Sequence, residues 1–97
     1  MSLLENLLLP RKKDILNVAH AHGARNVRIF GSVARGTESS SSDIDLLVEM
    51  DAGRGLIERV ALKQDLEDLL GRSVDLVTDR TLSQYLRETI LAEARPL

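Results

Sequence analysis

Three aspartates have a spacing that suits metal-assisted chemistry. Asp43 and Asp45 lie two residues apart at the start of a predicted strand, and Asp75 interrupts an apolar run, Val74–Val77. Alternate strand residues share a face, so the first two carboxylates are expected side by side, with Cα atoms about 6.5–7 Å apart. Such close like charges repel one another, and they contribute nothing to folding. Mg²⁺ or Mn²⁺ would remove the repulsion, and three carboxylates with substrate phosphates can hold two such ions.

A Gly-Ser pair follows another predicted strand and suits phosphate binding. Gly31 permits a tight turn and a close approach of the backbone to a ligand. The following N–H groups and the Ser32 hydroxyl can bind phosphate oxygens at a short helix N-terminus, and Arg35 can add a charged contact. Phosphate beside three acids requires a bridging cation, so the combination predicts phosphoryl-type transfer.

Each of these motifs also has an ordinary structural interpretation. A Gly-Ser pair is often only a turn, and an Asp-x-Asp pair can be a solvated edge or a loop cap. Asp75 can lie on the exposed face of an edge strand. The structural interpretation requires that all three motifs fall at strand ends by coincidence, so the sequence favours a functional site. His20 and His22 have i, i+2 spacing on a helix and do not face each other, which argues against a metal pair. We expect His22 to be partly buried and His20 to be exposed.

Hydrophobic periodicity predicts a single α/β domain over residues 1–97, with a small sheet packed against helices. Leucines of the first nine residues and Leu91 are candidate partner contacts, although internal packing explains them equally well. Pattern alone does not fix the strand directions. The predicted elements are a helix over 10–21, a strand over 27–30, a helical turn over 32–35, a strand over 44–49, a helix over 56–70, a strand over 74–77 and a last helix whose apolar face comprises Leu82, Tyr85, Leu86 and Ile90.

Composition excludes several classes of protein. The 97 residues include no cysteine, which rules out disulfides and thiolate metal sites. The only aromatic residues are Phe30 and Tyr85, and the net charge is −2, so direct nucleic-acid binding is not expected. No apolar run is long enough to span a membrane and no signal peptide is visible, so a cytoplasmic location is expected.

The motifs together resemble a known family. Gly31-Ser32, ten intervening residues and Asp43-Ile44-Asp45 match the Gly-Ser-x10-Asp-x-Asp signature of the DNA polymerase β-like nucleotidyltransferase superfamily. The strings GSVARGTESSSSDIDLLVEM and GRSVDLVT closely resemble the minimal nucleotidyltransferase family, and the likeness spans nearly the whole chain. The resemblance implies the nucleotidyltransferase fold with a small mixed sheet. It also implies that Asp43 and Asp45 ligate both metals, that Asp75 ligates the catalytic one and helps to activate the attacking hydroxyl, and that Gly31 and Ser32 hold the triphosphate.

The resemblance also implies an activity and a partner. Similar family members are antitoxins that transfer AMP from ATP to a tyrosine hydroxyl of a HEPN-domain toxin and release pyrophosphate. A hetero-oligomer with such a toxin is therefore expected, and the short chain leaves little room for an acceptor domain of its own. Two alternatives stay open. The chain could neutralise the toxin by binding alone, or it could modify a small-molecule acceptor.

Overall fold

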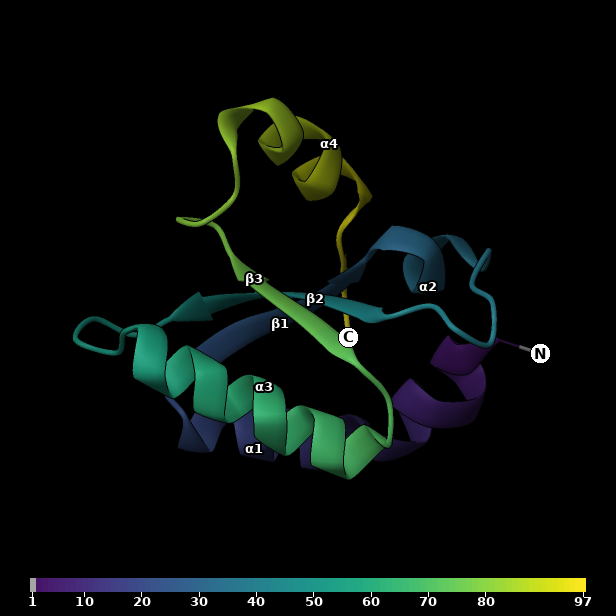
Figure 1. Cartoon of the computed structure of the whole chain (residues 1–97), viewed down its shortest axis with the longest axis horizontal. Helices are drawn as coiled ribbons and strands as arrows, with labels where there is room; N and C mark the ends of the chain where they lie inside the picture. The colour runs from purple at the N-terminus through teal and green to yellow at the C-terminus, as the bar shows by residue number, and fades with distance from the viewer. Residues whose placement is uncertain (1) are drawn as a thin grey trace.

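The computed structural model describes residues 2–97, which form a four-stranded sheet with helices on both of its faces (Figure 1). The long helices α1 and α3 lie against one face, and α2 and α4 lie on the other. The elements are the π-helical turn η1 (Leu4–Leu8), the 3₁₀ turn η2 (Leu9–Arg11), α1 (Lys12–Ala21), β1 (Ala24–Phe30), α2 (Gly31–Arg35), β2 (Ile44–Met50), α3 (Leu56–Leu70), β3 (Val74–Thr78), α4 (Gln84–Glu93) and β4 (Arg95–Pro96).

The sheet is mixed, which confirms the predicted fold class. Its strand order is β3-β2-β1-β4. Strands β2 and β3 run parallel, whereas β1 runs antiparallel to both β2 and β4. The carboxyl end of β1 therefore meets the amino ends of β2 and β3 at one edge of the sheet. Strand β4 was not predicted, because two residues, one of them a proline, carry no periodic signal.

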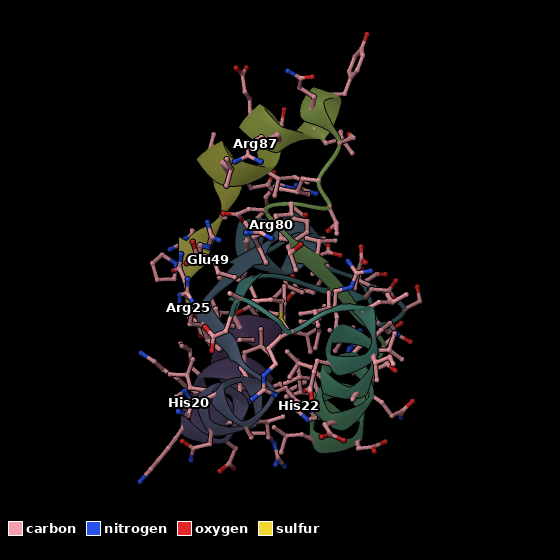
Figure 2. All side chains as sticks on the ribbon, turned by 90° about the vertical axis from the view of Figure 1, so that its left-hand side faces the viewer. His20, His22, Arg25, Glu49, Arg80 and Arg87 are labelled. Carbon is pink, nitrogen blue, oxygen red and sulfur yellow. The ribbon has the colours of Figure 1, made fainter. Side chains whose placement is uncertain are left out.

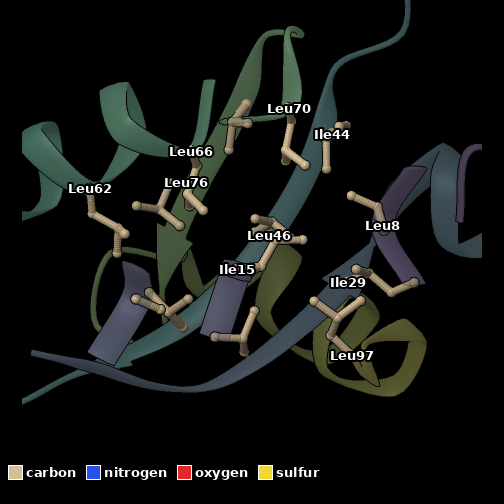
Figure 3. Packing of buried hydrophobic residues seen from close by; sticks show 14 of the residues in the cluster. Leu8, Ile15, Ile29, Ile44, Leu46, Leu62, Leu66, Leu70, Leu76 and Leu97 are labelled. Carbon is tan, nitrogen blue, oxygen red and sulfur yellow. The ribbon is translucent and has the colours of Figure 1, made fainter. Parts of the chain in front are cut away.

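An aliphatic core lies between the sheet and helices α1 and α3 (Figure 3). Alternate β2 residues face this core, and Leu47 is buried on the opposite face, so both faces of this strand are covered. Leu3, Leu4 and Leu7 pack against this core and Leu8 is fully buried, whereas Leu9 is 46% exposed; Met1 lies outside the described residues. The main core side chains are Leu8, Ile15, Ile29, Ile44, Leu46, Val48, Leu62, Leu66, Leu70, Leu76 and Leu97.

Local sequence signals set most of the element ends. Helix α3 has the predicted bounds, and Gly71 ends it in the left-handed conformation at φ +68°. The helix expected from residue 10 begins as the 3₁₀ turn η2, which includes Pro10, and becomes α-helical at Lys12. The strands are longer than predicted, since β1 begins at Ala24 and passes an irregularity between Arg25 and Arg28.

The apolar face predicted for the last helix is not buried in the structure, and Leu82 precedes the helix. No residue of α4 is buried, and Tyr85 is 97% exposed although it lies on the expected apolar face. Polar contacts hold the helix instead. The Ser83 hydroxyl accepts a hydrogen bond from the Leu86 N–H at 3.3 Å, and Arg87 donates to the Asp79 carbonyl at 2.8 Å. Helix α4 therefore stands away from the sheet face beneath it (Figure 1).

Candidate functional site

The acidic residues gather at the sheet edge where β2 and β3 begin. Asp45 and Asp75 are register partners on these parallel neighbours, so they lie side by side. Asp45 is half-buried and Asp75 is exposed. Asp43 precedes β2 by one residue and is exposed, so the shared-face argument from strand alternation does not apply to it.

The acidic residues influence one another electrostatically. Burial, then the charges of Asp75 and Asp43, raise the pKa of Asp45 to about 6, and Arg35 opposes this shift only in part. Glu93 of α4 adds to the repulsion. The site therefore concentrates negative charge that the described residues do not neutralise.

Gly31 fits closely against Asp45. Residue Phe30, at the end of β1, pairs with Asp45, so Gly31 begins α2 beside this carboxylate. Gly31 has a φ of +73°, and a Cβ atom placed there would lie 2.0 Å from Asp45 Oδ2. Only glycine allows the backbone and the carboxylate to be this close. The Gly-Ser motif and the Asp-x-Asp motif are thus parts of one steric arrangement.

Glu93 is a site residue that the sequence did not reveal. Its Oε1 accepts a hydrogen bond from the Gly31 N–H at 2.7 Å and also pairs with Arg35. The predicted phosphate-binding residues are therefore in contact with a carboxylate in this structure. The partners are 62 and 58 positions apart, and no local pattern around Glu93 marks it.

The serine-rich loop that leads to Asp43 is held by hydrogen bonds to residues of another segment, Arg72 and Ser73. Arg72 donates to the carbonyl oxygens of Ser39, Ser40 and Ser42, the last at 2.8 Å. The Ile44 N–H then donates to the Ser73 carbonyl at 2.9 Å. Asp43 thus lies between two fixed points, which define where its carboxylate can reach.

The carboxylate oxygens are suitable ligands for a hard cation, although these side chains are not arranged as a complete metal site. Within residues 2–97, no group of three or more His, Cys, Asp or Glu side chains is already arranged to hold a metal ion. Asp45 nevertheless carries an ionisation penalty that a divalent cation would relieve, and carboxylate oxygens are the ligands preferred by Mg²⁺ and Mn²⁺. Strand β3 is an edge strand and Asp75 is exposed, as the structural interpretation requires. The contact between Gly31 and Asp45 goes beyond what that interpretation explains.

The two histidines lie at the carboxyl end of α1 (Figure 2). His20 is exposed, and His22 is partly buried. The His22 ring contacts Glu58 at 3.0 Å and Asp65 at 2.6 Å, so it links the end of α1 to α3. It is a structural bridge.

The profile of the Nucleotidyltransferase domain family matches residues 5–97. Protein adenylyltransferase MntA of Thermococcus cleftensis is 34% identical over 90 residues, which cover 93% of this chain and 88% of that protein. A solved structure described provisionally as a minimal nucleotidyltransferase is 47% identical, with a TM-score of 0.86, and the match covers 100% of this chain and 97% of that one. A solved toxin–antitoxin assembly with AMP-PNP contains a chain 28% identical, with a TM-score of 0.76, over 88% of this chain and 70% of that one. No helix in residues 2–97 has the length and apolar character needed to cross a membrane.

Proposed function

Because this chain belongs to the nucleotidyltransferase domain family, we propose that it is an antitoxin that transfers AMP from ATP to a tyrosine hydroxyl of a HEPN-domain toxin. The name of the Thermococcus relative and the AMP-PNP-containing toxin–antitoxin assembly support this activity and this kind of partner. The observation that carries the proposal is the contact between Gly31 and Asp45, beside the register pair of Asp45 and Asp75. It joins a candidate phosphate-binding turn to a candidate metal-binding edge.

The three aspartates at the amino ends of β2 and β3 form an acidic edge, which suits a cation-dependent reaction. Asp43, Asp45 and Asp75 would hold Mg²⁺, with Mn²⁺ as an alternative and two ions as the expected number. The bound cation supplies charge neutralisation for the triphosphate and for the leaving pyrophosphate. The desolvation and repulsion at Asp45 are the physical reason that this edge favours a divalent cation.

The chain's own residues position the reactants. The first turn of α2 and the Ser32 hydroxyl bind the triphosphate oxygens. As the acceptor oxygen joins the α-phosphorus and pyrophosphate leaves, the carboxylate of Asp75 receives the proton of the hydroxyl. Glu93 occupies the Gly31 N–H in the structure, so the bound triphosphate must share or displace this contact. Arg35 pairs with Glu93, so a movement of Glu93 would free Arg35 to contact the phosphates.

Mass spectrometry of the toxin tests the proposal directly. Incubation with the chain, ATP and Mg²⁺ is expected to add AMP to a tyrosine, and Asp43→Asn is expected to slow the transfer by about a hundredfold or more. Asp14→Asn, an exposed substitution on α1, is the matched control and should retain the wild-type rate. An unmodified toxin in the presence of folded wild-type chain would contradict the activity.

Two further measurements separate the alternatives. If a triple asparagine variant of Asp43, Asp45 and Asp75 still neutralised the toxin completely, neutralisation would depend on binding alone. A turnover screen over hydroxyl-bearing small molecules that produced adenylylated product, with the toxin unmodified, would assign a small-molecule acceptor.

A further inference from the structure

A second charged site lies at the opposite ends of β2 and β3. A cavity of about 460 Å³ opens where these parallel strands finish, between the loop that follows each of them. Four arginines contribute to its lining: Arg25, Arg54, Arg59 and Arg80. Figure 2 shows Arg25, Glu49 and Arg80 on this side of the molecule, below α4. Crevices outside the carboxyl ends of parallel strands are a common location for ligands in α/β proteins.

The positive charge of this cavity is only partly used by ion pairs. Arg25 pairs with Asp51, and Arg54 pairs with Glu58 at 3.2 Å. Within residues 2–97, Arg59 and Arg80 make no ion pair. Two guanidinium groups are thus available to a ligand that enters the cavity.

The acidic residues of the lining do not cancel this charge. Asp51 is engaged by Arg25, and Asp79 is engaged at 3.0 Å by Arg28, which lies outside the lining. Glu49 is the remaining carboxylate, and within the same described residues it has no ion pair. The cavity therefore favours an anion, and Glu49 is the one lining group that opposes it.

The rest of the lining suits an uncharged body attached to the anion. Met50, Ala52 and Leu56 contribute apolar surface beside the arginines. The cavity volume falls within the range of about 300–1,000 Å³ that is usual for small-molecule sites. Guanidinium groups bind phosphate in a bidentate manner and also stack on planar rings. A phosphorylated molecule with a planar, uncharged body satisfies all of these features.

We propose that this arginine-lined cavity binds a nucleoside monophosphate without a metal ion. The site is separate from the acidic edge, because Glu49 follows Asp45 by four strand residues, a separation of roughly 13 Å at about 3.3 Å per residue. It also differs in its requirement. Phosphate reaches the acidic edge only with a divalent cation, whereas the arginines attract phosphate directly.

Titration of the full chain with AMP in EDTA tests this site, because chelation removes the cation on which the acidic edge depends. Backbone amide NMR signals of Gly53 and Gly55, which line the cavity, are expected to shift in a saturable manner. Adenosine, which lacks the phosphate, should bind at least about tenfold more weakly, since a charge-assisted hydrogen bond contributes enough free energy for such a factor.

Substitutions that are expected to weaken AMP binding, and one that is expected to strengthen it, make the assignment specific. The double variant Arg59→Gln and Arg80→Gln is expected to weaken AMP binding by about tenfold or more, and Glu49→Gln is expected to strengthen it. A matched double variant of the exposed α1 lysines, Lys12→Gln and Lys13→Gln, also removes two positive charges and should leave the affinity unchanged.

Four results would overturn the proposal. These are the absence of saturable AMP binding up to about 10 mM, a concentration that corresponds to negligible affinity, equal binding of adenosine, amide shifts centred on α2 rather than on the cavity, and equal weakening by the arginine and lysine double variants. None of these measurements depends on AMP transfer, so the cavity proposal and the proposed activity can fail separately.

Discussion

The two ends of the parallel pair β2–β3 have opposite electrostatic character. At the amino ends, Asp43, Asp45 and Asp75 form an acidic edge, and at the carboxyl ends four arginines line a cavity. The formal net charge of −2 conceals this separation. A nearly balanced composition therefore says little about anion binding, because the local field depends on where the charges lie.

The two ends also differ in how their carboxylates are stabilised. At the arginine-lined end, Asp51 and Asp79 each have an arginine partner. At the acidic edge, burial and like charges raise the pKa of Asp45, and Arg35 is shared with Glu93. Paired carboxylates are typical of a structural role, whereas a half-buried, repelled carboxylate is typical of a functional site.

The largest difference between the two ends is expected for their glycines. Gly31→Ala places a Cβ against Asp45 Oδ2, whereas Gly53→Ala at the other end meets no atom within 4 Å. Both residues have positive φ, +73° and +84°, so both substitutions cost about 1–2 kcal/mol of backbone strain. Only Gly31→Ala should displace Asp45 and lower AMP transfer, by about a hundredfold. Comparable transfer rates for the two variants, measured on folded protein, would show that the contact does not organise the site.

Ligand-induced stabilisation distinguishes the ends next. Mg²⁺-ATP at about a hundred times its Kd should stabilise the wild-type fold by about 2.7 kcal/mol. Asp45→Asn should remove most of this gain, and the Arg59→Gln, Arg80→Gln double variant should retain it. Thermal denaturation with and without Mg²⁺-ATP measures the difference. A gain that survives Asp45→Asn would place the Mg²⁺-dependent nucleotide site elsewhere.

Local signals explain what could be predicted of the fold. Helix α3 has a leucine repeat and a terminal glycine, and both of its ends were predicted correctly. Helix α4 has a similar apolar repeat, yet Leu86 remains exposed, and polar contacts of Glu93 with Gly31 and Arg35 hold this helix. Periodicity indicates that a helix forms, but it does not indicate what, if anything, the helix packs against.

The same distinction applies to the candidate site. The motif spacing predicted that the Gly-Ser turn and the aspartates act together, and the register of β1 and β2 places Gly31 beside Asp45. Glu93 could not be predicted, because its contact with Gly31 depends on how α4 returns over the sheet. The catalytic roles of the Gly-Ser turn and of the aspartates stay a prediction. The arginine-lined cavity was also missed, since its arginines come from three separate stretches of the chain.

A smaller effect concerns stability without metal. In EDTA at pH 8, Asp45→Asn should stabilise the fold by about 1 kcal/mol, because it removes a charge that burial and repulsion disfavour and that solvent screens only in part. Asp51→Asn removes a partner of Arg25 and should destabilise by a few tenths of a kcal/mol. Chemical denaturation of both variants measures the two changes in stability, which should have opposite signs. A loss of stability for Asp45→Asn would mean that the charges at the acidic edge are already neutralised.

A further small effect concerns His22, whose ring, when protonated, is a cation between two carboxylates. Hydrogen bonds to Asp65 and then Glu58 raise the pKa of His22, and Arg54 also faces Glu58. Because the folded-state pKa is raised, this contribution is fully present below the unfolded pKa of 6.5 and is lost as pH rises through the higher folded-state pKa. For a partly exposed bridge the loss should be about 0.5–1 kcal/mol.

Denaturation of wild type, His22→Gln and the exposed control His20→Gln at pH 5.5 and pH 8.5 measures this contribution. Asp45 changes stability in the same direction over part of this range, so the decisive quantity is the difference between wild type and His22→Gln at each pH. That difference should be larger at pH 5.5, and His20→Gln should follow wild type at both values. An equal difference at both pH values would show that His22 stabilises the α1–α3 contact through packing rather than charge. The comparison with the acidic edge would then fail, because the charge of His22 would not stabilise the carboxylates around it.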